Sequence, residues 1–160
     1  MNKTLLLEHI LMVLTQRQKL AEAAAMRAYN TATDGDNVAE NKYDTFALEA
    51  SYLAHGQSQR VLEYKAQVAE YKALEGGMNN IPSKISMASL VELVGAEDVT
   101  HRFFVGPSAG GLKIEFERQH ITIVTPQSPL GNALMGRQLD DGFQVDIAGK
   151  ITDYEVVSVQ

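Results

Sequence analysis

The sequence contains no cysteine, and it has no proline before Pro82. Without cysteine the chain has no disulfide framework, no thiolate nucleophile and no zinc site with sulfur ligands, which suits a reducing cytoplasm. No apolar run approaches the ~18 uninterrupted residues of a membrane-spanning helix. We therefore expect a cytoplasmic protein without a membrane segment.

The sequence also lacks a basic region. Residues 1–75 carry eight Lys and Arg against ten Asp and Glu, residues 84–160 carry six against ten, and the whole chain has a net charge of −6. Non-specific binding of nucleic acid requires a basic face that neutralises phosphates. Any contact with RNA or DNA is therefore expected to be indirect, through a protein partner.

The first half of the chain has the pattern of two long helices. Apolar residues recur at three- and four-residue steps over residues 7–28, and a second stripe with heptad spacing covers residues 47–71. Polar residues and a glycine interrupt the pattern at 33–36. These features predict an antiparallel helical hairpin over residues 1–75, with about 30 residues, or roughly 45 Å, in each helix.

The second half has a different pattern. Glycine, asparagine and proline mark residues 76–83 as a linker. Short β-type runs follow, and several alternate apolar and polar residues. The runs lie at residues 83–87, 89–94, 101–105, 112–116, 120–125, 143–147 and 154–159. They predict a small antiparallel sheet over residues 84–160, with a hairpin loop at residues 107–111.

One short helix is predicted inside this sheet domain. Ser128 is a capping residue, Pro129 suits the first helical position, and Gly136 suits the helix end. The apolar residues between them are Leu130, Ala133 and Leu134. The chain is therefore predicted to be an α+β protein, with a helical hairpin followed by a small antiparallel sheet and one short helix.

Residues 125–136, Thr-Pro-Gln-Ser-Pro-Leu-Gly-Asn-Ala-Leu-Met-Gly, closely resemble the SPLGxALLG signature of GreA/GreB-type transcription elongation factors. The turn and two strands that follow the signature in that family have counterparts at residues 140–142, 143–147 and 154–159. The resemblance implies an FKBP-like fold for the second domain and a surface that docks on RNA polymerase. That surface would include Phe103 and Phe104 and the signature residues Ser128, Pro129, Leu130, Gly131, Leu134 and Gly136.

Residues 35–41 look like the GDxxEN motif at the tip of the family's coiled-coil hairpin. In the family, the hairpin enters the secondary channel of RNA polymerase, and tip carboxylates help to hold a second Mg²⁺. The resemblance thus implies that Asp36 and Glu40 are ligands of a Mg²⁺ shared with the polymerase, and carboxylate oxygens suit this ion. The other implied channel contacts are Asp34, Asn41, Tyr43 and Asp44.

The function that this resemblance implies is relief of transcriptional arrest. The protein would bind RNA polymerase and promote cleavage of backtracked RNA by the polymerase's own active site. It would not itself be an enzyme, would have no cofactor of its own, and would act as a monomer.

Two alternative functions remain open, and the acidic residues of the tip also have a purely structural explanation. Asp36 and Glu40 lie four residues apart, where the family usually has three, so the protein could occupy the channel without stimulating cleavage. Acidic residues at a helix start also cap free N–H groups and complement the helix dipole, which is a structural explanation for the same residues. The second alternative is an interaction module whose alanine-rich hairpin pairs with another copy of itself.

Overall fold

A computed structural model of the protein describes residues 1–33, 46–77, 82–95 and 98–160. The chain forms two compact units. Residues 11–69 form one, called here the hairpin unit, and residues 1–10 together with 70–160 form the other, the sheet unit. Both ends of the sequence therefore belong to the sheet unit.

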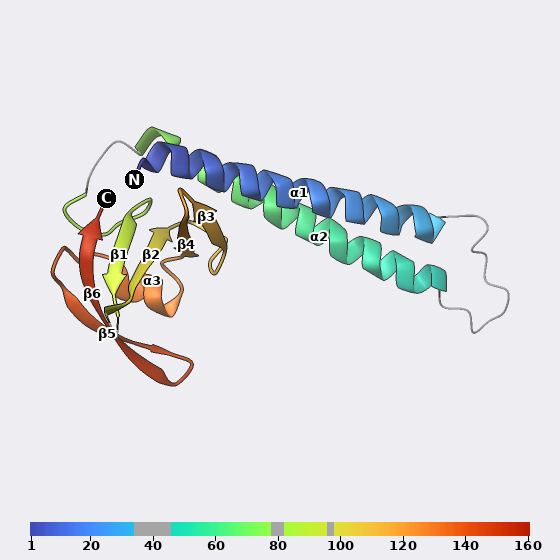
Figure 1. Ribbon diagram of the computed structural model, residues 1–160. Coiled ribbons are helices and arrows are strands. Elements are labelled where there is room, and N and C mark those ends of the chain that lie inside the picture. The colour runs from blue at the N-terminus through green and yellow to red at the C-terminus, as the bar shows by residue number, and fades with distance from the viewer. Residues whose placement is uncertain (34–45, 78–81, 96–97) are drawn as a thin grey trace. The chain divides into compact units, whose positions relative to one another are not determined.

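Two long helices make up most of the hairpin unit. α1 (Lys3–Thr33) and α2 (Phe46–Lys72) run side by side (Figure 1). An ion pair joins them at mid-length, with Lys65 Nζ 3.4 Å from Glu22 Oε1. Small apolar side chains fill the seam between the helices, and the buried ones are Leu14, Ala21, Ala28, Ala50, Val61 and Val68. The predicted helical stripes are thus confirmed.

The sheet unit contains one six-stranded sheet in the order β3-β4-β2-β1-β6-β5. The strands are β1 (Leu90–Val94), β2 (Thr100–Val105), β3 (Lys113–Phe116), β4 (Gln119–Val124), β5 (Gly142–Ile147) and β6 (Lys150–Val159). The short helix α3 (Pro129–Leu134) packs against β5, and the short 3-10 helix η2 (Glu75–Gly77) follows α2. The predicted fold class is confirmed.

One strand pair differs from the prediction of a wholly antiparallel sheet. β2 pairs with β4 in parallel, and β3 lies beyond β4 at the sheet edge. Residues 107–111 are therefore not the hairpin loop that was predicted. After β2 the chain passes to β3 at the sheet edge, and only then returns to form β4 beside β2. Backbone hydrogen bonds hold the segment between β2 and β3 to β4. The Gly106 N–H donates to Val124 O at 2.9 Å, and the Gly111 N–H donates to Ile123 O at 2.8 Å.

The strand predicted at residues 83–87 does not form. Ile85 instead pairs with the end of α3, where its N–H donates to Arg137 O at 2.7 Å and its carbonyl accepts from Gly136 N at 2.8 Å. The hydroxyl of Ser89 accepts from the Ser86 N–H at 3.0 Å, which stabilises a turn instead of an extended strand. The apolar pattern of this segment therefore reflects burial of Ile85 rather than a strand.

The sheet buries residues on both faces. Side chains of adjacent strand residues point to opposite faces, so Phe103 and Phe104 on β2 belong to different layers. Phe103 joins the core beneath α3, while Phe104 packs on Tyr71, with ring centroids 6.4 Å apart. The core beneath α3 consists of Ile85, Val91, Leu93, Phe103, Val105, Val124, Leu130, Leu134, Phe143, Val145 and Val156.

Candidate functional site

The segment that joins the two long helices holds the candidate metal ligands. α1 ends at Thr33 and α2 begins at Phe46, so Asp36 and Glu40 lie in sequence between the helices. These two residues, and the implied channel contacts Asp34, Asn41, Tyr43 and Asp44, lie outside the described residues. Their roles therefore stay predictions.

Within the described ranges, no cluster of three or more His, Cys, Asp or Glu residues is arranged to hold a metal ion. In the same ranges, no helix combines the length and apolar character needed to cross a membrane.

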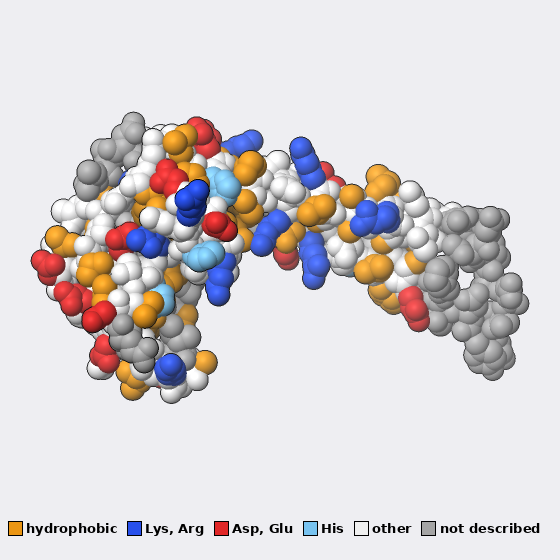
Figure 2. All heavy atoms as spheres, viewed as in Figure 1, with side chains coloured by type: hydrophobic (Ala, Val, Ile, Leu, Met, Phe, Trp, Pro, Cys, Tyr) orange, Lys and Arg blue, Asp and Glu red, His pale blue; other side chains and the backbone are white. Residues whose placement is uncertain are grey.

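An apolar groove lies on one flank of the hairpin unit. Its volume is about 710 Å³, and both helices line it. Three of its large side chains are well exposed: Met26 by 60%, Tyr29 by 57% and Leu62 by 61%. Figure 2 shows hydrophobic side chains at the surface along both helices. Exposed apolar patches of this kind mark surfaces that contact other molecules.

The residues of the predicted docking surface are organised around the start of α3. The Ser128 hydroxyl accepts a hydrogen bond from Gly131 N at 3.1 Å and donates one to Thr125 O at 2.7 Å. Ser128 is thus the N-cap, Pro129 follows it in the first turn, and Gly136 after the helix has a φ of +81°. The helix limits predicted from these three residues are confirmed.

Most of this segment faces inward. Leu130 and Leu134 are buried in the core, and Gly131 packs so closely on Thr125 that a Cβ would overlap the Thr125 carbonyl oxygen. Exposed side chains of the segment include those of Pro129 and Met135. The signature residues therefore build and position the helix, and the docking role itself stays a prediction.

The two phenylalanines assigned to the same docking surface are also internal. Phe103 is 9% exposed and Phe104 is fully buried. Phe104 contacts Tyr71, and the Tyr71 ring in turn lies so near Gly106 that a Cβ there would overlap its hydroxyl. Sequence patterns placed Tyr71 only on a helical stripe, because no local signal reports its distant partners on the sheet.

Comparison with known proteins gives a consistent picture. No family model matches the chain. The chain is 26% identical over 123 residues to transcription elongation factor GreA of Legionella pneumophila strain Corby, covering 69% of this chain and 77% of that protein. It is 24% identical over 119 residues to GreA of Psychromonas ingrahamii, covering 66% and 74%. The chain is thus similar to GreA transcription elongation factors at low sequence identity.

Two of the solved structures that resemble this chain also have names that refer to GreA. GreA factor homolog 1 (Gfh1) of Thermus thermophilus aligns over 94% of both chains at 17% identity, with a TM-score of 0.39. The GreA/GreB factor from Nitrosomonas europaea covers 65% of this chain and 91% of its own, at 18% identity and a TM-score of 0.37. The curated relatives bear the name of a transcription factor and not of an enzyme, in agreement with the expectation that the chain has no active site of its own.

Proposed function

We propose that this GreA/GreB-like chain binds RNA polymerase and inserts the end of its helical hairpin into the polymerase's secondary channel. There it promotes cleavage of backtracked RNA and relieves arrest. The observation that carries the proposal is the similarity to GreA proteins over about two thirds of the chain. Two paired helices of 31 and 27 residues, joined by an acidic segment, support it.

The length of the hairpin suits this role. A helix rises 1.5 Å per residue, so α1 is roughly 46 Å long and can carry the acidic segment far into a channel. The apolar groove at Met26, Tyr29 and Leu62 supplies surface for contact with protein walls. Because both halves of the chain are acidic, the contacts that hold the complex together are expected to be with protein and not with nucleic acid.

The carboxylates of Asp36 and Glu40 are the donors that would hold a Mg²⁺ shared with the polymerase. Hard oxygen ligands fit this ion, and a protein commonly supplies only one or two of them. When bound, the ion would activate water and neutralise developing charge. The chain's own part is to bring the two carboxylates to the polymerase's reacting atoms.

Halted, backtracked elongation complexes with labelled RNA test the proposal. The protein is expected to shorten the transcripts, and an Asp36→Asn/Glu40→Gln variant is expected to bind polymerase without shortening them. A Glu63→Gln/Glu75→Gln variant removes the same charge from exposed sites and should behave like the parent. Loss of cleavage in both variants would contradict a specific role for the tip carboxylates.

The four-residue spacing of Asp36 and Glu40 favours one other function. A regulator that occupies the channel needs the hairpin but not a pair of correctly spaced ligands. It would bind polymerase and change pausing or initiation, and neither the parent nor the tip variant would cleave RNA. The same assay therefore separates the two functions.

A further inference from the structure

β5 forms one edge of the six-stranded sheet. It comes last in the sheet order, and β6 is its one neighbouring strand among the described residues (Figure 1). An edge strand presents backbone N–H and C=O groups that can pair with another extended chain. Both ends of β5 show which of its residues direct these groups outward.

The turn that follows β5 fixes the hydrogen-bond pattern at one end. Ala148 and Gly149 have φ values of +55° and +83°, which is the geometry of a two-residue type I′ turn. The residues that flank such a turn, Ile147 and Lys150, exchange both backbone hydrogen bonds, and bonded pairs then alternate along the two strands. The odd-numbered residues of β5 therefore bond to β6.

The start of β5 has the same alternation. Just before the strand, the Val156 N–H donates to Asp141 O at 3.0 Å, so Asp141 also bonds to β6. The even-numbered residues Gly142, Gln144 and Asp146 thus direct their N–H and C=O groups away from β6. All three residues are exposed, and no hydrogen bond joins these backbone groups to another described residue. The outer edge of β5 is therefore open to a further strand.

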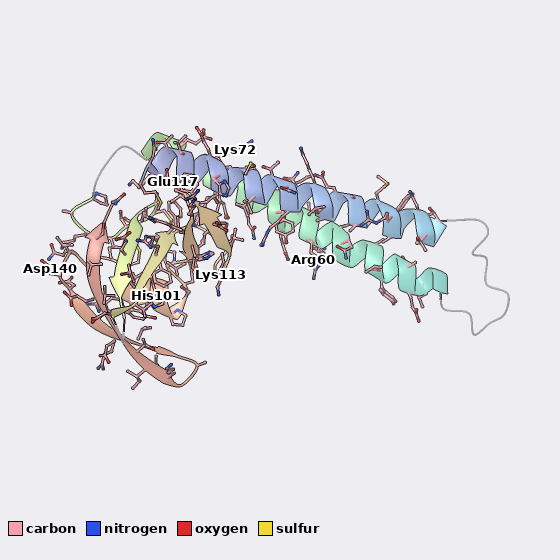
Figure 3. All side chains as sticks on the ribbon, viewed as in Figure 1. Arg60, Lys72, His101, Lys113, Glu117 and Asp140 are labelled. Atoms are coloured by element: carbon pink, nitrogen blue, oxygen red, sulfur yellow. The ribbon has the colours of Figure 1, made fainter. Side chains whose placement is uncertain are left out.

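β5 is less protected against pairing than the other edge of the sheet. It has six residues, contains neither proline nor lysine, and keeps an unbroken register with β6. β3, at the opposite edge, has four residues, and the exposed side chains along it are Lys113, labelled in Figure 3, and Glu115. Short length and charged side chains are common protections of an edge strand. β5 is thus the edge better suited to pairing.

One face of β5 is apolar. Phe143 and Val145 are buried in the core beneath α3, and the Phe143 ring packs on Tyr154 of β6 with ring centroids 5.8 Å apart. Side chains directly opposite each other on paired strands lie on the same face and contact each other. A strand added to β5 therefore continues this face best with apolar side chains opposite Phe143 and Val145.

The opposite face of the β5–β6 hairpin is acidic. Asp146, Asp153 and Glu155 are exposed there, and no described lysine or arginine forms an ion pair with them. From residue 140 to residue 155 the chain has five carboxylates and a single lysine. An added strand places every second side chain on this face, so basic side chains at those positions are attracted. A second copy of the chain would instead bring two acidic faces together.

We propose that the outer edge of β5 binds an extended segment of a partner protein by strand addition, and that this segment alternates basic and apolar residues. Its backbone pairs with Gly142, Gln144 and Asp146, and its basic side chains face the carboxylates. In this mode of recognition main-chain hydrogen bonds supply affinity and alternate side chains supply specificity. The edge uses none of the tip carboxylates, so the binding does not depend on the proposed cleavage function.

Amide hydrogen exchange of the full chain, followed by NMR, tests the proposal with the peptide acetyl-(Lys-Val)3-amide. The peptide is expected to slow exchange at Gly142, Gln144 and Asp146, whose N–H groups gain acceptors. Exchange at Lys113 and Glu115, on the other edge of the sheet, should not change. Protection at β3 in place of β5 would overturn the proposal.

Two N-methylated forms of the peptide separate strand pairing from charge attraction. In the paired strand the lysine N–H groups point toward β5 and the valine N–H groups point away, because bonded and non-bonded pairs alternate. N-methylation of the three lysines removes these donors and should weaken binding at least about tenfold. N-methylation of the three valines keeps the same composition and charge and should change little. Equal binding of the two forms would contradict strand addition.

Two variants of the chain test the charge of the partner segment. Asp146→Asn/Asp153→Asn keeps the edge and should weaken the unmethylated peptide about fivefold, because cross-strand charge pairs are lost. Glu115→Gln/Glu117→Gln removes as much charge from the β3–β4 hairpin and should leave binding unchanged. Equal weakening by both variants would show diffuse charge attraction and overturn the proposal. A dimer in light scattering that the peptide dissociates would show that a second copy occupies the edge, which also overturns it.

Discussion

The hydroxyl of Tyr71, in the last turn of α2, donates a hydrogen bond to the backbone carbonyl of Ser108 at 2.9 Å. The ring is fully buried against Phe104, and Gly106 provides the space that it occupies. One side chain thus attaches the end of a helix to a loop 37 residues away. Because the Tyr71 side chain is buried, water cannot take the place of the Ser108 carbonyl as the acceptor of this hydrogen bond.

Replacing Tyr71 with phenylalanine should weaken the sheet unit. The change keeps the ring but leaves the Ser108 carbonyl without this donor, so we expect the free energy of unfolding to fall by about 1 kcal/mol. Urea unfolding followed by circular dichroism measures the loss. Tyr52→Phe is a matched control, because Tyr52 is 71% exposed and should tolerate the change. An equal effect in both variants would contradict the role of the bond.

The stability of the protein should fall at alkaline pH because of the same residue. Burial raises the pKa of the Tyr71 hydroxyl, and the negative charge of Glu70 adds to the increase. The folded state therefore holds the proton more tightly than the unfolded chain, in which tyrosine titrates near pH ~10. The stabilisation is complete below about pH 10 and decreases as the pH rises above it.

Unfolding measured between about pH 9 and 11 checks this dependence. Tyr71→Phe removes the titrating group, so its stability should decline less steeply with pH than that of the parent. Parallel curves for the two proteins would mean that other groups cause the alkaline loss.

Gly131→Ala should disrupt the sheet unit severely. The new Cβ would overlap the carbonyl oxygen of Thr125, which belongs to the backbone and cannot rotate away. We expect a loss of several kcal/mol, in the range of the most damaging single substitutions. Gly142→Ala is the matched control, because a Cβ there meets nothing within 4 Å. Thermal unfolding of both variants would show whether close packing at Gly131 is the cause.

Removal of the helix cap should have a smaller effect. Ser128→Ala deletes the acceptor for the Gly131 N–H and the donor to Thr125, and loss of an N-cap typically costs ~1 kcal/mol. Ser128→Asn retains a capping oxygen and should recover part of the stability. If Ser128→Asn is as unstable as Ser128→Ala in urea, the cap is not the stabilising element.

Features set by neighbouring residues were predictable from the sequence. The stripes over residues 7–28 and 47–71 identified the hairpin, because one helical period repeats over many turns. Ser128, Pro129 and Gly136 identified α3, because caps and breakers act within a few residues.

Features set by distant residues were not predictable in this way. The parallel pairing of β2 with β4 depends on where the chain crosses, and the loop at 107–111 has the composition of a hairpin turn. Residues 83–87 have an apolar pattern that their pairing with the end of α3 overrides. The partners of Tyr71 and Tyr154 are likewise brought together only by the folded sheet.

The sheet unit combines residues 1–10 with residues 70–160, so its formation requires contacts between residues far apart in the sequence. The long helices rely on local contacts and can form within microseconds. The sheet unit forms only when its two parts, which are separated in the sequence by residues 11–69, come together. Leu6, Leu7 and Ile10 are buried in the folded protein, and their unit is completed by residues that follow the hairpin in the sequence. These apolar side chains thus lack the rest of their unit while residues 11–69 are being synthesised, and a chaperone has that interval in which to bind them.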